Sequence, residues 1–149
     1  REGGLMAGMT VIVKTISRLL FPFVFLYGVY IVLHGHLTPG GGFPGGVIIA
    51  ASVVMLVLAY GLENVKGKRS LVREEVLDVV GSLTISIMCL LGLFVGAYFL
   101  QNVFPLGGLG RLFSGGEFLP LYLGVGIKVT AGLLLILYAM LFMTGGEQK

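Results

Sequence analysis

The stretch HGHLTPGGGFPGG, residues 34–46, interrupts an otherwise apolar first half of the chain and decides how that half is organised. Its last eight positions hold five glycines and two prolines. Glycine permits positive φ and close backbone approach, while each proline fixes φ and removes a hydrogen-bond donor. We therefore predict tight turns rather than regular helix, forming a structural loop from Pro39, Gly40, Gly41, Gly42, Phe43, Gly45 and Gly46.

This glycine-rich run lacks the features of the known phosphate-binding loops. A P-loop would require a Lys directly after the glycines, and none follows here. A dinucleotide site would require a strand before the glycines and an acidic residue about 20 residues after them, whereas no strand is predicted before this run and the residues after it are uncharged for most of that distance. Pro44 before a long apolar run indicates instead that a helix begins here. A packed turn is favoured over a ligand cradle.

The composition is that of an integral membrane protein. The 149 residues are 56% hydrophobic and 11% charged, with a mean hydropathy of +1.02, whereas a soluble domain is roughly 25% charged. We expect a multi-pass protein of the cell membrane, in contact with the lipid bilayer. The net charge of +3 lies in loops and indicates no nucleic-acid surface. Because the chain starts at Arg1 rather than Met, we expect a few residues to be missing there.

An all-α fold with four membrane spans follows from the apolar runs, since a spanning helix needs about 20 apolar residues. Pro22 lies inside the first run, which is either one kinked helix or an interfacial segment followed by a shorter span. We favour the kinked helix, with Lys14 and Arg18 reaching the headgroups. Within a single domain, 1–149, we predict helices at about 11–33, 44–62, 75–100 and 119–143.

The basic residues are distributed unevenly between the two predicted sides, which predicts the orientation. One side holds only Arg111, and the glycine-rich loop lies on it. The predicted cytoplasmic side, with both termini, holds Arg1, Lys14, Arg18, Lys66, Lys68, Arg69, Arg73 and Lys149.

Lys128 is the most informative candidate for function. It lies about nine residues into the fourth predicted helix, roughly 13 Å from its outer end. A charge at such depth costs at least ~2.5 kcal/mol unless it is paired, hydrated or neutral. Asp78 is predicted to lie ~15–20 Å away in depth, near the other membrane surface. We therefore expect Lys128 to meet a carboxylate or an aqueous cavity from another chain; the alternative is a lysine that reaches the outer interface.

Three further residues are candidates for an ion path. Asp78 is either an acid in a first helical turn, favoured by the helix dipole, or a cation or proton site. It begins a stripe of small and polar residues typical of a helix–helix contact in lipid. His34 and His36 titrate near neutrality and could relay protons. No third ligand lies nearby, so we predict no metal site, and no catalytic constellation is present in the sequence.

The run HGHLTPGGGFPGG, entered from RLLFPFVFLYGVYIVLHGH and followed directly by a second span, resembles the MnhB/MrpB family. These are small B-type components of multisubunit Mrp-type sodium/proton antiporters, and the same module recurs in archaeal membrane-bound hydrogenase-type complexes. The resemblance covers nearly the whole chain. It implies a non-enzymatic subunit without its own cofactor, whose partners are other membrane subunits and whose cargo is sodium ions and protons.

The last helix departs from the bacterial pattern, in which an acidic residue often occurs early; here Tyr122-Leu123-Gly124 has none and Lys128 follows. Together with Pro44, this favours the archaeal respiratory branch. Three hypotheses remain open: a subunit that helps to form the ion path and the scaffold, a purely structural subunit, or a stand-alone four-helix transporter acting as a homodimer. The absence of an acid at mid-depth counts against the third.

Overall fold

The computed structural model describes residues 9–37, 39–61, 68–95, 98–99, 102, 104, 107–108 and 114–146. These residues form four helices and no strand: α1 (Val11–Leu33), α2 (Gly42–Tyr60), α3 (Lys68–Val95) and α4 (Phe118–Gly146). All four are long and apolar enough to cross a membrane. The predicted all-α fold with four spans is confirmed, and α1 is one continuous helix that contains Pro22.

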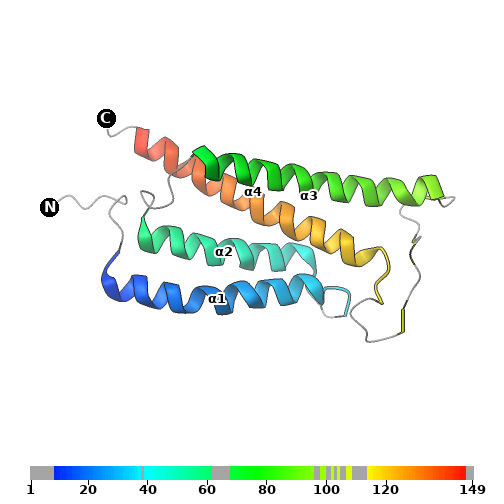
Figure 1. Ribbon diagram of the computed structural model, residues 1–149, viewed down its shortest axis with the longest axis horizontal. Helices are drawn as coiled ribbons and strands as arrows, with labels where there is room; N and C mark the ends of the chain where they lie inside the picture. The colour runs from blue at the N-terminus through cyan, green and yellow to red at the C-terminus, as the bar shows by residue number, and fades with distance from the viewer. Residues whose placement is uncertain are drawn as a thin grey trace.

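Successive helices run in opposite directions (Figure 1), so the bundle has two distinct ends. We call the end where α1 and α3 begin the base. The opposite end, with residues 34–37, 39–41 and 114–117, is the tip. The base corresponds to the predicted cytoplasmic side, which stays a prediction. Arg1, Lys66, Arg111 and Lys149, on which the predicted orientation partly rests, lie outside the described residues.

The helix α2 begins two residues earlier than predicted. Gly42 and Phe43 are therefore helical, and their assignment to the loop alone was wrong. Gly45 and Gly46 were named with the loop but also fall in the predicted helix 44–62, and the structure places them in the helix. The turn before α2 ends at Gly40 and Gly41, with φ of +153° and +90°, conformations that glycine adopts without strain. Pro44 is tolerated because amide groups in a first helical turn have no partner within the helix.

The helix α3 begins at Lys68, seven residues before the predicted start at Glu75. Residues 68–74 were predicted to lie between the second and third helices, but Lys, Arg and Glu are good helix formers. The predicted end near Leu100 falls on residues that are partly outside the described ranges. As a consequence, Asp78 and every residue after it lie about two turns further into the helix than expected.

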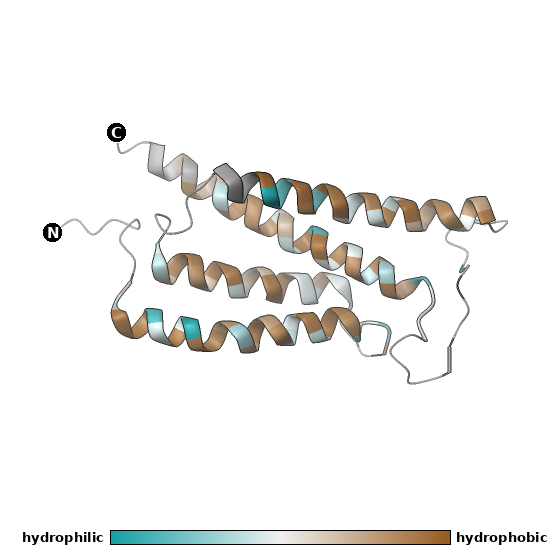
Figure 2. Cartoon of the chain, viewed as in Figure 1, coloured by the Kyte–Doolittle hydropathy of each residue, from teal (hydrophilic) through white to brown (hydrophobic). Residues whose placement is uncertain are grey.

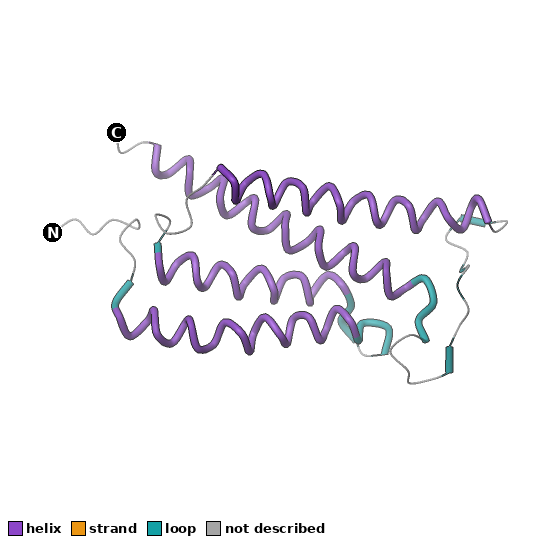
Figure 3. Tube along the Cα trace, viewed as in Figure 1, coloured by secondary structure: helices purple, strands orange, loops and turns teal. Residues whose placement is uncertain are grey.

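The four helices pack in the order α1–α2–α4–α3 (Figure 3). A smaller contact joins α1 to α4, and within the described residues α3 packs against α4 alone. The core between α2 and α4 is centred on Val57, Leu134 and Tyr138. Much of the outer surface of α1 and α3 is apolar (Figure 2), as expected for helices that face lipid or other membrane subunits.

The glycines of the first turn of α2 let this helix lie close to two neighbours. A β-carbon on Gly45 would overlap the Val32 side chain and lie 3.0 Å from the carbonyl oxygen of Gly28 on α1. One on Gly46 would lie 2.8 Å from the carbonyl oxygen of Gly126 on α4. The hydroxyl of Thr130 donates to the carbonyl oxygen of Gly46 across the same contact (3.1 Å). Gly45 and Gly46 are therefore packed between helices as part of α2 and not as a turn.

Candidate functional site

Lys128 of α4 and Asp78 of α3 form a salt bridge between the two helices. The Lys128 ammonium donates to both carboxylate oxygens of Asp78, at 3.1 and 3.2 Å, and to the Ser82 hydroxyl oxygen at 2.6 Å. The Ser82 hydroxyl in turn donates to the backbone carbonyl of Asp78 at 2.9 Å. All three donors of the ammonium are thus directed into one polar cluster that spans two helices.

Gly81 positions the two helices for this contact. A β-carbon at Gly81 would lie 2.8 Å from the backbone nitrogen of Lys128 and 2.9 Å from the carbonyl oxygen of Gly124. Both are backbone atoms, so they cannot move aside as a side chain could. The absence of a side chain at Gly81 therefore lets α4 approach closely enough for Lys128 to reach Asp78 and Ser82.

The prediction that Lys128 finds its carboxylate in another chain was wrong, because Asp78 is its partner. The error came from the helix boundaries. Since α3 begins at Lys68, Asp78 lies ten residues into the helix, about 15 Å from its start. The end of α3 also extends past the start of α4 at the tip (Figure 1), so the two helices are staggered. The interpretation of Asp78 as an acid in a first turn is wrong for the same reason.

The cluster is only partly covered by this chain. Of the side-chain surfaces, 43% of Lys128 and 31% of Asp78 remain exposed. An apolar groove lined mainly by α1 and α4 also includes Leu77 of α3, and no charged side chain lines it. Neither Lys128 nor Asp78 is among the residues that line this groove.

Sequence reasoning missed two buried acids. Glu74, which precedes the predicted third helix, lies on α3 four residues before Asp78 and is 8% exposed. Glu117, assigned to a loop, is 6% exposed at the start of α4, where its amide donates to the Asn102 side chain at 3.1 Å. For Glu74, the four-residue spacing to Asp78 was the available signal. For Glu117, nothing in the sequence distinguished it from an exposed loop acid.

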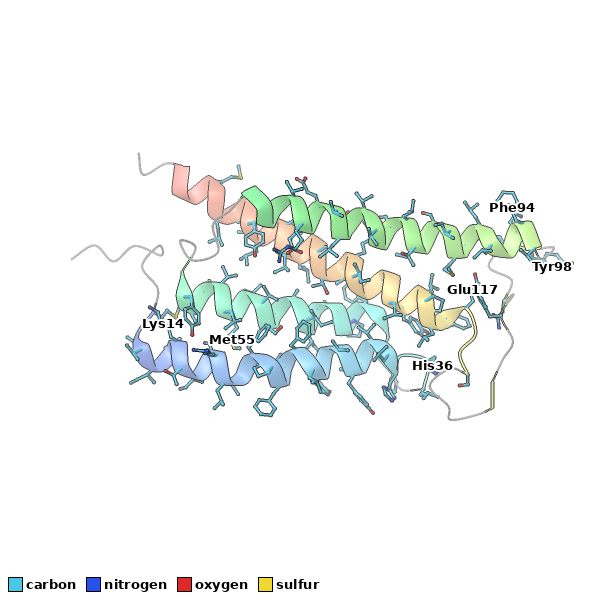
Figure 4. All side chains as sticks on the ribbon, viewed as in Figure 1. Lys14, His36, Met55, Phe94, Tyr98 and Glu117 are labelled. Carbon is cyan, nitrogen blue, oxygen red and sulfur yellow. The ribbon has the colours of Figure 1, made fainter. Side chains whose placement is uncertain are left out.

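The two predicted histidines lie at the tip, away from the Lys128 cluster. His34 stacks on Tyr30 with ring centroids 4.1 Å apart, and its Nδ1 donates to the Tyr30 carbonyl at 3.1 Å. His36 packs close to Gly115, just before Glu117, and Figure 4 shows His36 and Glu117 at this same end. The structure therefore separates the four predicted candidates into a pair, Asp78 and Lys128, and two residues of the tip.

The described residues contain no group of three or more His, Cys, Asp or Glu side chains that could hold a metal ion. What the Lys128 cluster offers chemically is a carboxylate, an ammonium and a hydroxyl that exchange hydrogen bonds. Ionisable groups of this kind inside a membrane span are costly and commonly mark ion or proton pathways.

Comparisons with known proteins agree with this architecture. Residues 12–135 match the family described as a domain related to the MnhB subunit of Na+/H+ antiporter. The B component of the Na(+)/H(+) antiporter of Bacillus subtilis is 40% identical over 95 residues, covering 62% of this chain and 64% of the relative. An uncharacterised protein of Methanocaldococcus jannaschii is 32% identical over 130 residues, covering 83% of this chain and 49% of the relative.

A solved structure shows the same fold. A chain of the membrane-bound sulfane sulfur reductase, an archaeal respiratory membrane complex, matches with a TM-score of 0.74 and 38% identity, covering 92% of this chain and 60% of that one. The present chain thus spans about half to two thirds of the length of these relatives. With four membrane-spanning helices and a family match over most of its length, the chain is a multi-pass membrane protein of the MnhB antiporter-subunit family.

Proposed function

We propose that this chain is a small subunit of a multisubunit sodium/proton antiporter module, in which Lys128 and Asp78 line the ion path. The observation that carries the proposal is their salt bridge, which lies within two membrane-spanning helices and is partly uncovered. The names of the relatives support transport by the assembly. The respiratory complex that contains the solved neighbour favours an archaeal membrane-bound complex over a free-standing antiporter.

In this proposal the chain is a transport subunit and performs no redox chemistry. The Asp78 carboxylate supplies oxygen ligands of the kind that small cations bind, and Lys128 competes for the same oxygens. An arriving cation or proton weakens the Lys128–Asp78 contact, and its departure restores it. The partly exposed side of the pair requires water or a partner subunit, because lipid tails cannot solvate charges. His34 and His36 remain candidates for the tip end of the path.

The test is sodium and proton movement in membrane vesicles that contain the intact complex. Lys128→Met and Asp78→Asn should each reduce transport at least about tenfold, while the native gel still shows the assembled complex. Lys14→Met is the matched control, since Lys14 lies at the base end of α1, as Figure 4 shows, and outside the cluster. Normal transport in both cluster variants would contradict the proposal.

The competing function is a purely structural subunit. The close packing of the glycines between helices favours this structural function, because such contacts hold helices in place without binding a ligand. A structural subunit predicts that the cluster variants change assembly but not transport per assembled complex. Purification distinguishes these two subunit functions from a stand-alone homodimeric transporter. The homodimer would stay active when it is purified without larger partners.

A further inference from the structure

One stripe of α1 connects two positive charges near the base to the apolar groove that α1 and α4 line. Lys14, Arg18, Phe21, Phe25 and Val29 follow one another at steps of three and four residues, so they lie on one side of the helix. Val29, at the tip end of the stripe, lines the groove. Lys14 and Arg18 are the charged residues of α1, and α2 has none. The stripe therefore starts with a cationic end and continues as an apolar surface.

The groove offers an apolar surface to whatever fills it. Its one polar side chain is Thr130, whose hydroxyl donates to the carbonyl oxygens of Gly126 and Gly46 at 2.7 and 3.1 Å. On α4, the groove extends from Leu123 to Ala131, about 12 Å along the helix axis. Its volume is about 240 Å³. A helix ~10 Å in diameter would need about 900 Å³ over the same length, so the groove fits a hydrocarbon chain and not a whole helix.

Two aromatic rings lie between the cations and the groove. The ring centroids of Phe21 and Phe25 are 5.6 Å apart, and Phe25 is 38% exposed. Along α1, Arg18 and Val29 are about 16 Å apart, which is close to the ~15 Å depth of hydrocarbon in one leaflet. A lipid whose phosphate lies at Arg18 therefore has acyl chains long enough to pass these rings and enter the groove.

We propose that this stripe and the groove bind one anionic lipid of the base-side leaflet, with its phosphate at Arg18 and an acyl chain in the groove. The planar guanidinium of Arg18 matches the phosphate oxygens, and Lys14 adds a second positive charge one turn nearer the membrane surface. Lys14 lies at the base end of α1 (Figure 4). The lipid fills the space beside the small contact between α1 and α4. This site lies outside the Lys128 cluster, and Lys14→Met leaves Arg18 and the groove in place.

The first test is photolabelling of the intact wild-type complex in phosphatidylcholine vesicles. Two lipids with the same photoreactive acyl chain are compared at the same low mole fraction, one with an anionic phosphoglycerol headgroup and one with a zwitterionic phosphocholine headgroup. Peptide mass analysis locates the products. We expect the anionic lipid to label residues 123–131 of α4 at least about fivefold more strongly.

Two results of this comparison would overturn the proposal. Equal labelling by both lipids would mean that the groove contacts bulk lipid without recognising charge. Labelling of residues 123–131 by neither lipid would mean that another subunit covers the groove. Neither reading depends on a variant that assembles.

The second test removes the charges. Arg18→Gln should lower labelling by the anionic lipid about fivefold, and the double variant with Lys14→Gln about thirtyfold, because each basic residue near the surface attracts anionic lipid. Labelling by the zwitterionic lipid should not change. Arg73→Gln is the matched control, since Arg73 is exposed at the base end of α3 and does not line the groove. Unchanged labelling of the double variant would overturn the proposal.

The third test fills the groove and leaves both charges in place. Val29→Phe adds a ring where Val29 lines the groove, so labelling of residues 123–131 should fall at least about fivefold with the anionic lipid. Leu26→Phe is the control, because Leu26 is 71% exposed and does not line the groove. A native gel checks that both complexes assemble. Equal labelling of the two variants would place the acyl chain outside the groove and contradict the proposed site.

Discussion

The helix α4 packs against α2 on one side and α3 on the other, and the two contacts are built differently. On the α2 side, Gly42 and Gly46 bring backbone against backbone. Among the described residues, the side-chain hydrogen bond across this contact is the one that the Thr130 hydroxyl donates to the Gly46 carbonyl oxygen. On the α3 side, backbones meet at Gly81, and the contact continues through Lys128 and Asp78. The α2 contact is fixed by shape, whereas the α3 contact is held by groups that can change charge and partner. A transported ion could act on the second contact without loosening the first.

The largest effect is expected where the α2 contact is broken by one added methyl group. A β-carbon on Gly42 would overlap the Tyr122 carbonyl oxygen and lie 3.1 Å from the Gly126 nitrogen. Backbone atoms on both helices would have to separate, so Gly42→Ala should destabilise the assembled complex by about 3 kcal/mol. The measurement is the fraction of complex that survives heating, read on a native gel.

Gly108→Ala is the control for this substitution, because nothing lies within 4 Å of a β-carbon at Gly108. It should survive heating like the wild type. Equal survival of the Gly42→Ala complex would show that the α2 contact can adjust, and the contrast between the two sides of α4 would disappear.

The sequence predicted the fold through the lengths of its apolar runs, but it did not predict where charged helix ends begin. The glycine-rich run was recognised as the organising element, yet Gly42, Phe43, Gly45 and Gly46 proved to be helical. Composition alone cannot distinguish glycines that bend a chain from glycines that make room for a neighbouring helix. That difference depends on α1 and α4, which are distant in sequence.

An intermediate effect is expected when the α3 contact loses one charge. Asp78→Asn and Lys128→Met should each destabilise the complex by about 2 kcal/mol, less than for a fully buried pair, because 31% and 43% of the two side chains are exposed. The double variant should cost less than the sum of the two single variants, since each single change leaves one charge unpaired.

Thermal survival of all four forms of the complex measures this coupling. Simple additivity of the two single effects would mean that the salt bridge contributes nothing to the α3–α4 contact. Thermal survival is independent of ion transport, so the result separates the stability of the pair from its proposed role in the path.

The site was predicted in part. Lys128 was identified because a charge deep in an apolar helix is costly, and Asp78 was named as a candidate. Their contact was missed because a seven-residue error in the start of α3 misplaced Asp78 by about 10 Å. Depth along a helix depends on where the helix begins, and charged residues obscure that boundary. The burial of Glu74 and Glu117 depends on tertiary packing, which a single sequence does not contain.

The smallest effect is expected for a glycine beside the salt bridge itself. A β-carbon on Gly132 would lie 3.9 Å from Asp78 Oδ1, an ordinary contact, with nothing closer outside its own helix. Alanine also favours a helix more than glycine does. Gly132→Ala should therefore leave the stability of the complex unchanged or raise it by up to about 1 kcal/mol. Thermal survival on the native gel should then equal or exceed that of the wild type, whereas Gly42→Ala should lower it. A loss of stability as large as that of Gly42→Ala would mean that α3 and α4 are packed as tightly at Gly132 as α2 and α4 are at Gly42. The α3 contact would then have no room for Lys128 and Asp78 to rearrange when an ion arrives.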